Sequence, residues 1–366
     1  MSDLKQRIQD GLDGKFEGLG NGFNRLNRFL FGVQRKCYTL LGGQSGTFKT
    51  TLADYIVSNA IQDASSKNIK LDVFYYSFEI DKLSKQCNWL ASIIYRKYGI
   101  EISPEKIKGL GDIRLTDEEA NLVKDEISEI EAMFSKINFT FKPTNPTGLY
   151  MDLWKHGQDN GKFEYENYID ANGDTKRKIS KYIPNNPDAY TLVVIDHAAL
   201  SNKERGFTTK ETLDKLSEYI IELRNMFGFS FLVLQQFNQG LSSVERAKFK
   251  GVDLSPQQSD FKDSTNLYQD ADIVLGTMNP YKLDLHESLG YDINKLKSNM
   301  IMLKIIKNRL SKAIQNKDFS DILELQKLFM NSPLPVSQIS QPIPILKGGN
   351  RREKKTDTSS YIKLKL

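Results

Sequence analysis

The stretch Gly43-Gln44-Ser45-Gly46-Thr47-Phe48-Lys49-Thr50 lies between an apolar run and an amphipathic stretch of the chain. It matches the phosphate-loop pattern G-x-x-x-x-G-K-[ST] at every fixed position except the second glycine, where Phe48 stands. In such a loop, successive backbone N–H groups and the start of a helix bind phosphate oxygens. Lys49 would reach the β- and γ-phosphates of ATP, Thr50 would hold Mg²⁺, and Thr51 is a further candidate for nucleotide binding. The alternative is an ordinary glycine-rich turn before a helix.

Phe48 is the departure from this pattern. Its side chain must point away from a bound nucleotide. A residue other than glycine is acceptable there if the backbone has right-handed φ and ψ.

Apolar runs alternate with helical patterns on both sides of the loop. The apolar runs predict strands at Cys37–Leu41, Leu71–Phe78, Ile137–Phe141, Thr191–Ile195, Phe229–Leu234, Ile273–Met278 and Met300–Ile306. Helices are expected at Lys49–Gln62, Lys82–Lys97, Asp117–Ser135 and Lys210–Met226. This alternation predicts an α/β fold, with a mostly parallel central sheet and helices on both faces.

Composition excludes several classes of protein. Hydrophobic residues make up 39% of the 366 residues and charged residues 27%, an ordinary balance for a globular protein. The net charge of +5 permits a polyanionic partner without requiring one. Two cysteines and three scattered histidines argue against a structural zinc site. No apolar stretch has the length of a membrane span, and the start is not a signal peptide, so a cytoplasmic protein without a membrane partner is expected.

Three segments depart from the alternation of strands and helices. Residues 1–20 read as a short helix with Leu4, Ile8 and Leu12 on one stripe, followed by a flexible glycine-rich linker. Residues 21–331 form the main domain, in which a polar insertion at 158–190 is expected to be a β-hairpin turning at Asn172-Gly173. Residues 332–366 are Pro- and Ser-rich and then basic, which predicts a disordered tail.

A buried strand ends in a carboxylate at Thr191-Leu192-Val193-Val194-Ile195-Asp196. The carboxyl ends of parallel strands form the edge at which α/β folds bind ligands. A carboxylate beside Thr50 would hold Mg²⁺ through water. Apolar strands ending in Asp are common, but this one follows a phosphate loop, and the two features together predict an ATP-hydrolysing enzyme.

Two further polar residues end predicted strands. Glu79 could orient and deprotonate the water that attacks the γ-phosphate, although a solvated glutamate is the alternative. Gln236 could hydrogen-bond the γ-phosphate and report its presence to the following loop, with Gln235 as the competing assignment.

The order of these motifs resembles that of the DnaB-type replicative helicases of the RecA-like superfamily, over roughly residues 15–310. The string GFNRLNRFLFGVQ is similar to that family's approach to the phosphate loop, and YYSFEI resembles its S-L-E-M segment, which implies that Glu79 is catalytic. VVIDHAAL resembles V-I-D-Y-L-Q-L, with His197 in place of tyrosine, and this implies the Mg²⁺ role for Asp196. LVLQQFNQGL resembles A-L-S-Q-L-N-R-S-L, which favours Gln236 over Gln235 as the sensor.

Two later segments extend the resemblance to ring-forming members. SDFKDSTNLYQDADIVL resembles S-D-L-R-E-S-G-x-I-E-Q-D-A-D-x-I-L, whose first part is a loop lining the central channel. This implies DNA contacts at Lys262, Asp263 and the backbone near Thr265, although lysine and threonine replace an arginine and a glycine. Lys307-Asn308-Arg309 is similar to the family's K-x-R pair, which implies that Lys307 and Arg309 reach the γ-phosphate bound by a neighbouring subunit.

The resemblance implies a RecA-like motor domain that uses ATP and Mg²⁺, translocates 5′ to 3′ on single-stranded DNA and unwinds duplex DNA. It also implies a homo-oligomeric ring, expected to be a hexamer of phage or plasmid type, in which the N-terminal helix docks on the adjacent subunit. Primase or other replisome proteins are possible partners. The alternatives are a RecA- or RadA-type recombinase filament and a KaiC- or RepA-like switch that uses ATP as a signal.

Overall fold

The computed structural model describes residues 2–12, 14, 17–237, 254–288, 291–310 and 361–365. Within these residues, eight strands form one sheet in the order β12-β11-β8-β1-β7-β6-β2-β3. Their bounds are β1 (Tyr38–Gly43), β2 (Leu71–Ser77), β3 (Ile137–Thr140), β6 (Tyr190–Asp196), β7 (Ser230–Gln236), β8 (Ile273–Met278), β11 (Met300–Asn308) and β12 (Tyr361–Lys365). The strands from β8 to β3 are parallel, and β11 runs antiparallel to both β8 and β12. The seven expected strands and the mostly parallel sheet are confirmed.

Both faces of the sheet are covered, which explains why its strands are apolar throughout. Along β6, Leu192 and Val194 belong to one buried cluster, whereas Val193 and Ile195 belong to the other. Successive side chains of a strand point to opposite faces, so each face receives every second residue.

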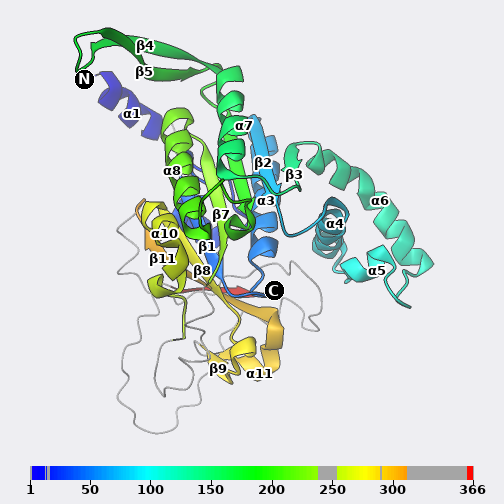
Figure 1. Cartoon of the computed structure of the whole chain (residues 1–366). Helices are drawn as coiled ribbons and strands as arrows, with labels where there is room; N and C mark the ends of the chain where they lie inside the picture. Colours follow the sequence, from blue (N-terminus) through cyan, green and yellow to red (C-terminus); the bar gives the residue numbers. More distant parts are fainter. Residues whose placement is uncertain are drawn as a thin grey trace.

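Helices from different parts of the chain cover the two faces (Figure 1). The first face packs against α2 (Asn24–Leu30), α3 (Lys49–Ser66), α4 (Lys82–Tyr98), α5 (Pro104–Lys108) and α6 (Asp117–Phe134). The second face packs against α7 (Pro146–Asp159), α8 (Thr209–Phe227) and α10 (Thr265–Asp270). Two of the long helices start at capping boxes, Thr116 with Glu119 and Thr208 with Glu211. Each box satisfies backbone N–H groups that have no partner within the helix.

The N-terminal segment contains the expected helix, but the glycine-rich residues after it pack on the domain. Helix α1 (Ser2–Leu12) is present, with Leu4, Ile8 and Leu12 exposed. The expected flexible linker is wrong for residues 17–22, which are bound to the domain. Leu19 is buried and exchanges backbone hydrogen bonds with Val33. The glycines allow this close packing, because a Cβ at Gly18 would collide with the carbonyl oxygens of Phe31 and Val33.

The polar insertion forms an antiparallel hairpin, β4 (Gly161–Ile169) and β5 (Thr175–Pro184), which turns through Asn172 and Gly173 and projects from the domain (Figure 1). Aromatic packing anchors its base, since Phe163 contacts Trp154 and Phe227, and Tyr182 packs edge-on against Phe227. A two-stranded ribbon is marginally stable by itself, so this base is what holds it in place.

The remaining described elements lie at the end of the chain and around β8. A small unit contains β9 (Glu287–Ser288), β10 (Tyr291–Asp292) and α11 (Ile293–Leu296). The expectation of a disordered tail over 332–366 is not met at residues 361–365, which pair with β11 as strand β12. The sequence there alternates apolar residues with lysines, a pattern suited to an edge strand. Residues 332–360 and 366 lie outside the described residues.

In the part of the chain that the structure describes, no helix has the length and apolar character needed to cross a membrane.

Candidate nucleotide-binding site

The glycine-rich loop connects the end of β1 to the start of α3, at the carboxyl edge of the parallel strands. Glycine is required at position 43, because a Cβ there would collide with the hydroxyls of Thr47 and Thr277. Those two hydroxyls lie 2.8 Å apart, and Thr47 also donates to the carbonyl of Gln44 at 2.8 Å. The loop is therefore closed on itself and tied to β8. Thr277 was not expected from the sequence, where it is one residue of an apolar run.

The backbone of Phe48 is not right-handed. It has φ 61° and ψ 30°, a left-handed conformation that favours glycine, the residue that the phosphate-loop pattern has at this position. Its half-buried side chain packs against the first core cluster. Contact with the core holds a bulky residue in a backbone conformation that costs about 1–2 kcal/mol outside glycine.

Lys49 begins helix α3 and bends back over the loop. Its ammonium donates to the carbonyl oxygens of Gly43 at 2.9 Å and Gln44 at 2.8 Å. Burial lowers the pKa of Lys49 to about 8, and the nearby carboxylates of Glu79 and Asp196 oppose that shift. The side chain is thus a cation held at the loop by neutral carbonyls, which a phosphate group would attract more strongly.

Asp196 ends β6 beside the first turn of α3. Its Oδ1 accepts a hydrogen bond from the Thr50 hydroxyl at 3.0 Å, which brings the two expected Mg²⁺ residues together. Its buried Oδ2 has no hydrogen-bond partner among the described residues. Burial raises the pKa of Asp196 to about 6, and Lys85 opposes the rise. A hydroxyl beside a carboxylate with one unpaired oxygen fits an Mg²⁺ ion held partly through water.

Glu79 follows β2 at the same edge of the sheet and is exposed. Its charge acts on Lys49, Asp196 and the buried His197, and it raises the pKa of His197 against the larger lowering effect of burial. The structure thus brings Glu79 near Lys49 and Asp196, with its carboxylate open to solvent.

Gln235 and Gln236 end β7 next to the loop. Gln236 pairs with Gly43 in the sheet and is half-buried. Gln235 is buried, and its Oε1 has no hydrogen-bond partner within the described residues. The half-buried position leaves Gln236 better placed to reach a ligand on the loop.

Lys282 brings a second cation to the loop, which the sequence did not suggest. It lies in a short 3₁₀ turn after β8, and its ammonium occupies the space that a Cβ on Gly46 would need. The turn is fixed by the buried Asn279, whose Oδ1 accepts from the backbone N–H groups of Tyr281 and Lys282.

Lys85 is a second unexpected cation, and its side chain is fully buried. Its Nζ lies 2.9 Å from Asp54 Oδ1 and 4.0 Å from Asp196 Oδ2. In the sequence it looks like one of several lysines on a solvated helix face.

Lys307 and Arg309 lie away from the loop of their own chain. Lys307 pairs with Val274 near the start of β8, whereas Gly43 pairs with Thr277 near its end. Lys307 donates to the carbonyls of Tyr268 and Gln269, and Arg309 also donates to Gln269. Burial and the charge of Arg309 lower the pKa of Lys307 to about 8.

The proposed DNA-contact segment forms a 3₁₀ helix, Gln258–Ser264, that continues into α10 at Thr265. It is anchored by Phe261, which is buried against Phe237 and Gly42 at the end of β1. The backbone of Lys262 and Asp263 is described, but their side chains lie outside the described part of the structure.

Comparison with known proteins supports the fold through similar structures, whereas comparison of sequences identifies no family. No protein-family model and no curated protein matches the sequence. Many solved structures are similar, among them the following two. The ATPase domain of a phage helicase has a TM-score of 0.61 and 18% identity, with 85% of this chain and 91% of that chain covered. A DnaB-like replicative helicase, studied with its primase interactions, has a TM-score of 0.60 and 18% identity, with 84% of this chain and 62% of that chain covered.

The chain therefore spans less than two thirds of the DnaB-like structure and nearly all of the ATPase domain. Together with the sheet order and the loop after β1, these likenesses show that the chain has the RecA-like fold of DnaB-type helicase ATPase domains.

Proposed function

We propose that this protein is the ATP-driven motor of a ring-shaped replicative DNA helicase. The observation that carries the nucleotide part is the 3.0 Å hydrogen bond between Thr50 and Asp196, beside a loop that also presents Lys49. These groups come from α3 and β6 and meet at the carboxyl edge of the sheet, where a bound triphosphate and Mg²⁺ would lie.

The proposed chemistry assigns one task to each group. Backbone N–H groups of residues 44–50 and the Lys49 ammonium bind phosphate oxygens. Thr50 and Asp196 would hold Mg²⁺, which would supply positive charge to offset that of the phosphates. Glu79 accepts the proton of the attacking water, and its open position leaves room for that water. Gln236 contacts the γ-phosphate from the neighbouring strand.

Lys307 and Arg309 supply the argument for a ring. Gly43 and Lys307 are separated by two strand spacings and by about three residues along β8, on the order of 14 Å. Neither cation reaches its own chain's loop, so both would act on a nucleotide bound by a neighbour. A repeated head-to-tail contact of this kind closes into a ring when its rotation permits, and we propose a hexamer.

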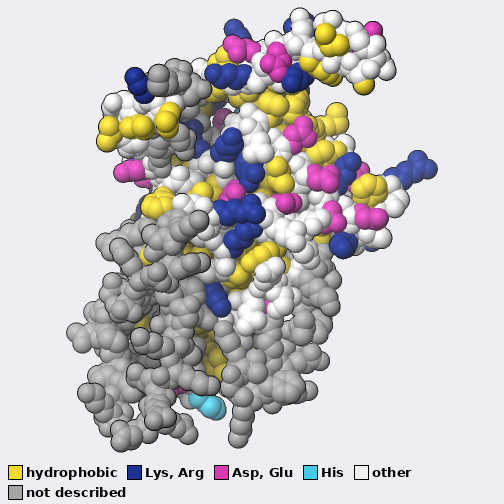
Figure 2. Space-filling model, turned by 90° about the vertical axis from the view of Figure 1, so that its left-hand side faces the viewer, with side chains coloured by type: hydrophobic (Ala, Val, Ile, Leu, Met, Phe, Trp, Pro, Cys, Tyr) yellow, Lys and Arg dark blue, Asp and Glu magenta, His cyan; other side chains and the backbone are white. Residues whose placement is uncertain are grey.

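The proposed DNA site is the segment around Lys262, Asp263 and Thr265, repeated around the ring. A motor that moves along any sequence needs contacts with the phosphate backbone rather than with bases. Figure 2 shows Lys and Arg side chains in a row down the middle of the described part of one face, with most Asp and Glu side chains above it and to its right. Helix α1, with its exposed leucines and isoleucine, would dock on the adjacent subunit.

The similarity to a DnaB-like helicase studied with primase makes primase a candidate partner and the cytoplasm the expected location. Translocation from 5′ to 3′ is part of the same proposal.

A strand-displacement assay on a forked DNA duplex, with ATP and Mg²⁺, tests the proposed helicase activity. We expect unwinding that requires a 5′ single-stranded arm. Strand pairing without displacement would instead indicate a recombinase, and ATPase activity indifferent to DNA would indicate a nucleotide switch.

A further inference from the structure

Lys85 lies one turn into helix α4 and is shielded completely from solvent. A buried lysine destabilises the folded state unless it is paired, because burial removes the water that stabilises its charge. Lys85 is paired with Asp54 of α3 at 2.9 Å. The ring of Tyr75 from β2 lies 4.1 Å from the ammonium, and the Tyr75 hydroxyl donates to the same Asp54 oxygen at 2.7 Å.

The same ammonium also faces the proposed Mg²⁺ site. Asp196 Oδ2, the oxygen without a hydrogen-bond partner in the described residues, lies 4.0 Å from Lys85 Nζ. One cation is therefore shared by two carboxylates, closely with Asp54 and more loosely with Asp196.

Lys85 connects the elements that carry the separate parts of the site. Helix α3 begins with Lys49 and Thr50 and also carries Asp54. Strand β6 ends with Asp196, and Glu79 precedes α4 by only a few residues. A shift of Lys85 toward either carboxylate would therefore move α4 and Glu79 relative to the Mg²⁺ site.

Stability alone gives a weak reason for this arrangement. Replacing a buried ion pair with apolar residues of similar volume is often neutral or stabilising, and the surrounding cluster is already apolar. The Asp54–Lys85 pair also faces Asp196, which gives it a second role to consider at the proposed Mg²⁺ site.

We propose that Lys85 is a positioning residue that couples the Mg²⁺ site at Asp196 to helix α4, and through it to Glu79. This inference rests on the proposed ATPase site but not on DNA unwinding. When the charge of Asp196 is shared with a metal ion, its attraction for Lys85 weakens. Lys85 then lies closer to Asp54, and α4 adjusts with it.

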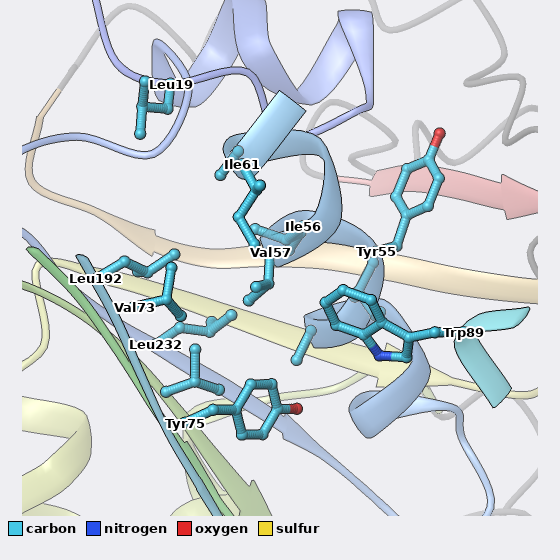
Figure 3. Close-up of a cluster of buried hydrophobic side chains, with 14 of the residues drawn as sticks. Leu19, Tyr55, Ile56, Val57, Ile61, Val73, Tyr75, Trp89, Leu192 and Leu232 are labelled. Carbon is cyan, nitrogen blue, oxygen red and sulfur yellow. The ribbon is translucent and has the colours of Figure 1, made fainter. Parts of the chain in front are cut away.

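Trp89 offers a direct probe of this movement. It lies one helical turn after Lys85, is buried, and packs edge-on against Phe134 with ring centroids 5.2 Å apart. Figure 3 shows it in the same buried cluster as Tyr75. The sequence has only two tryptophans, and the other, Trp154, lies on α7 against the second core cluster. A Trp154→Phe background therefore leaves Trp89 as the single indole reporter.

The decisive variant is the double replacement Asp54→Leu with Lys85→Met, which removes both members of the closer ion pair and leaves Asp196 without its more distant cation. Lys85→Met alone would strand Asp54 and is expected to unfold more readily, so it is the lesser test. A matched control removes another ion pair of α4, by Lys97→Met with Glu126→Leu, whose ammonium and carboxylate lie 2.7 Å apart. That pair joins α4 to α6 and has no contact with Asp196.

Three measurements are made on full-length protein in the Trp154→Phe background: thermal unfolding, ATPase kinetics, and Trp89 fluorescence on addition of ADP with and without Mg²⁺. For the double variant we expect near-normal unfolding, KM within about threefold, and a fall in kcat on the order of 10²-fold. The Mg²⁺-dependent change in Trp89 fluorescence should disappear. The control pair should keep both the kcat and the fluorescence change.

A folded double variant with normal kcat and a normal Trp89 response would overturn the proposal, because the Asp54–Lys85 pair would then serve only the fold. Loss of ADP binding would also overturn it, since Lys85 would be acting on affinity. The fluorescence response needs neither hydrolysis nor DNA. It therefore separates a failure of this coupling from a failure of the proposed helicase activity.

Discussion

The proposed site residues at the carboxyl edge of the sheet contact one another within one chain, whereas those at the opposite edge lie away from them. At the carboxyl edge, Thr50 and Asp196 are hydrogen-bonded to each other, and Lys49 bonds to the loop itself. At the opposite edge, Lys307 and Arg309 bond to the carbonyls at the end of α10. We propose that the first arrangement binds a nucleotide within one chain, and that the two cations of the second act on a nucleotide bound by a neighbouring chain.

The difference between the edges is what a repeated interface requires. A site shared between subunits needs one half on each of two surfaces, and the two halves must not meet within a single chain. The carbonyl partners of Lys307 and Arg309 are neutral, so a phosphate from another subunit can displace them with a gain in charge pairing.

Arg309→Ala tests this comparison with the largest expected effect. ATP turnover should fall roughly 10³-fold, as when a cation supplied from a neighbour to the transferred phosphoryl group is lost. Nucleotide binding should persist because the loop is intact. Mixtures with wild-type protein should lose DNA unwinding more steeply than the mutant fraction predicts, because unwinding needs the subunits of a ring to act together, and linear loss would argue for independent active sites.

A complementation experiment sharpens the same prediction. Lys49→Ala and Arg309→Ala should each be inactive, but a mixed ring contains interfaces in which both residues are intact. With equal mixing, about a quarter of the interfaces should be restored if the site is shared between subunits. No recovery after subunit exchange would place Arg309 in its own chain's site and contradict the comparison.

Glu79→Gln tests the carboxyl edge. The amide keeps the size of the side chain but cannot accept the proton of the attacking water, so kcat should fall roughly 10²–10³-fold. Binding of ATP, measured with a fluorescent analogue and Mg²⁺, should be retained. Asp112→Asn is a suitable control, because Asp112 is an exposed acid outside the site. Normal hydrolysis by Glu79→Gln would remove Glu79 as the catalytic base.

Lys262→Ala tests whether single-stranded DNA binds at the segment around Lys262 or at the basic residues of the C-terminal tail. We expect about tenfold less stimulation of the ATPase by single-stranded DNA, with basal ATPase unchanged. Replacing Arg351, Arg352, Lys354 and Lys355 with Gln should leave stimulation largely intact. This charge variant is preferable to truncation after Asn331, because truncation would also remove β12 from the edge of β11.

The opposite pattern would move the DNA site to the basic tail. If the tail variant alone lost DNA binding, Lys262 would be a solvated surface residue. The stretch Arg246–Lys250 is a further basic candidate. It lies outside the described residues, as does 351–355.

The strands and long helices could be predicted because their signals are local. Strands buried on both faces are apolar runs, and the polar residues that end them necessarily gather at one edge. Asp196 was predicted from that rule and Thr50 from the phosphate-loop pattern, and the two side chains lie within hydrogen-bonding distance. Their roles in binding Mg²⁺ stay predictions.

The features that could not be predicted depend on partners distant in the sequence. Lys85 is buried because Asp54, 31 positions away, meets it in the core. Thr277 closes the loop from a strand 230 positions beyond Thr47. The glycine segment before α2 looked flexible because the same residues that loosen a chain also permit tight packing.

The last prediction concerns Phe48, where backbone strain and side-chain packing make opposing contributions of similar size to the free energy of unfolding. Glycine at position 48 would relieve about 1–2 kcal/mol of left-handed backbone strain. It would lose about 1 kcal/mol from the half-buried ring. The free energy of unfolding of Phe48→Gly should therefore stay within about 1 kcal/mol of the wild type. Phe48→Ala keeps the strain, loses most of the packing, and should be less stable by about 1 kcal/mol.

Urea unfolding compares the free energies of unfolding of the two variants. Because the ring points into the core, neither should change nucleotide affinity by more than about threefold. If alanine proved as stable as glycine, the left-handed conformation of Phe48 would not be a source of strain in this loop.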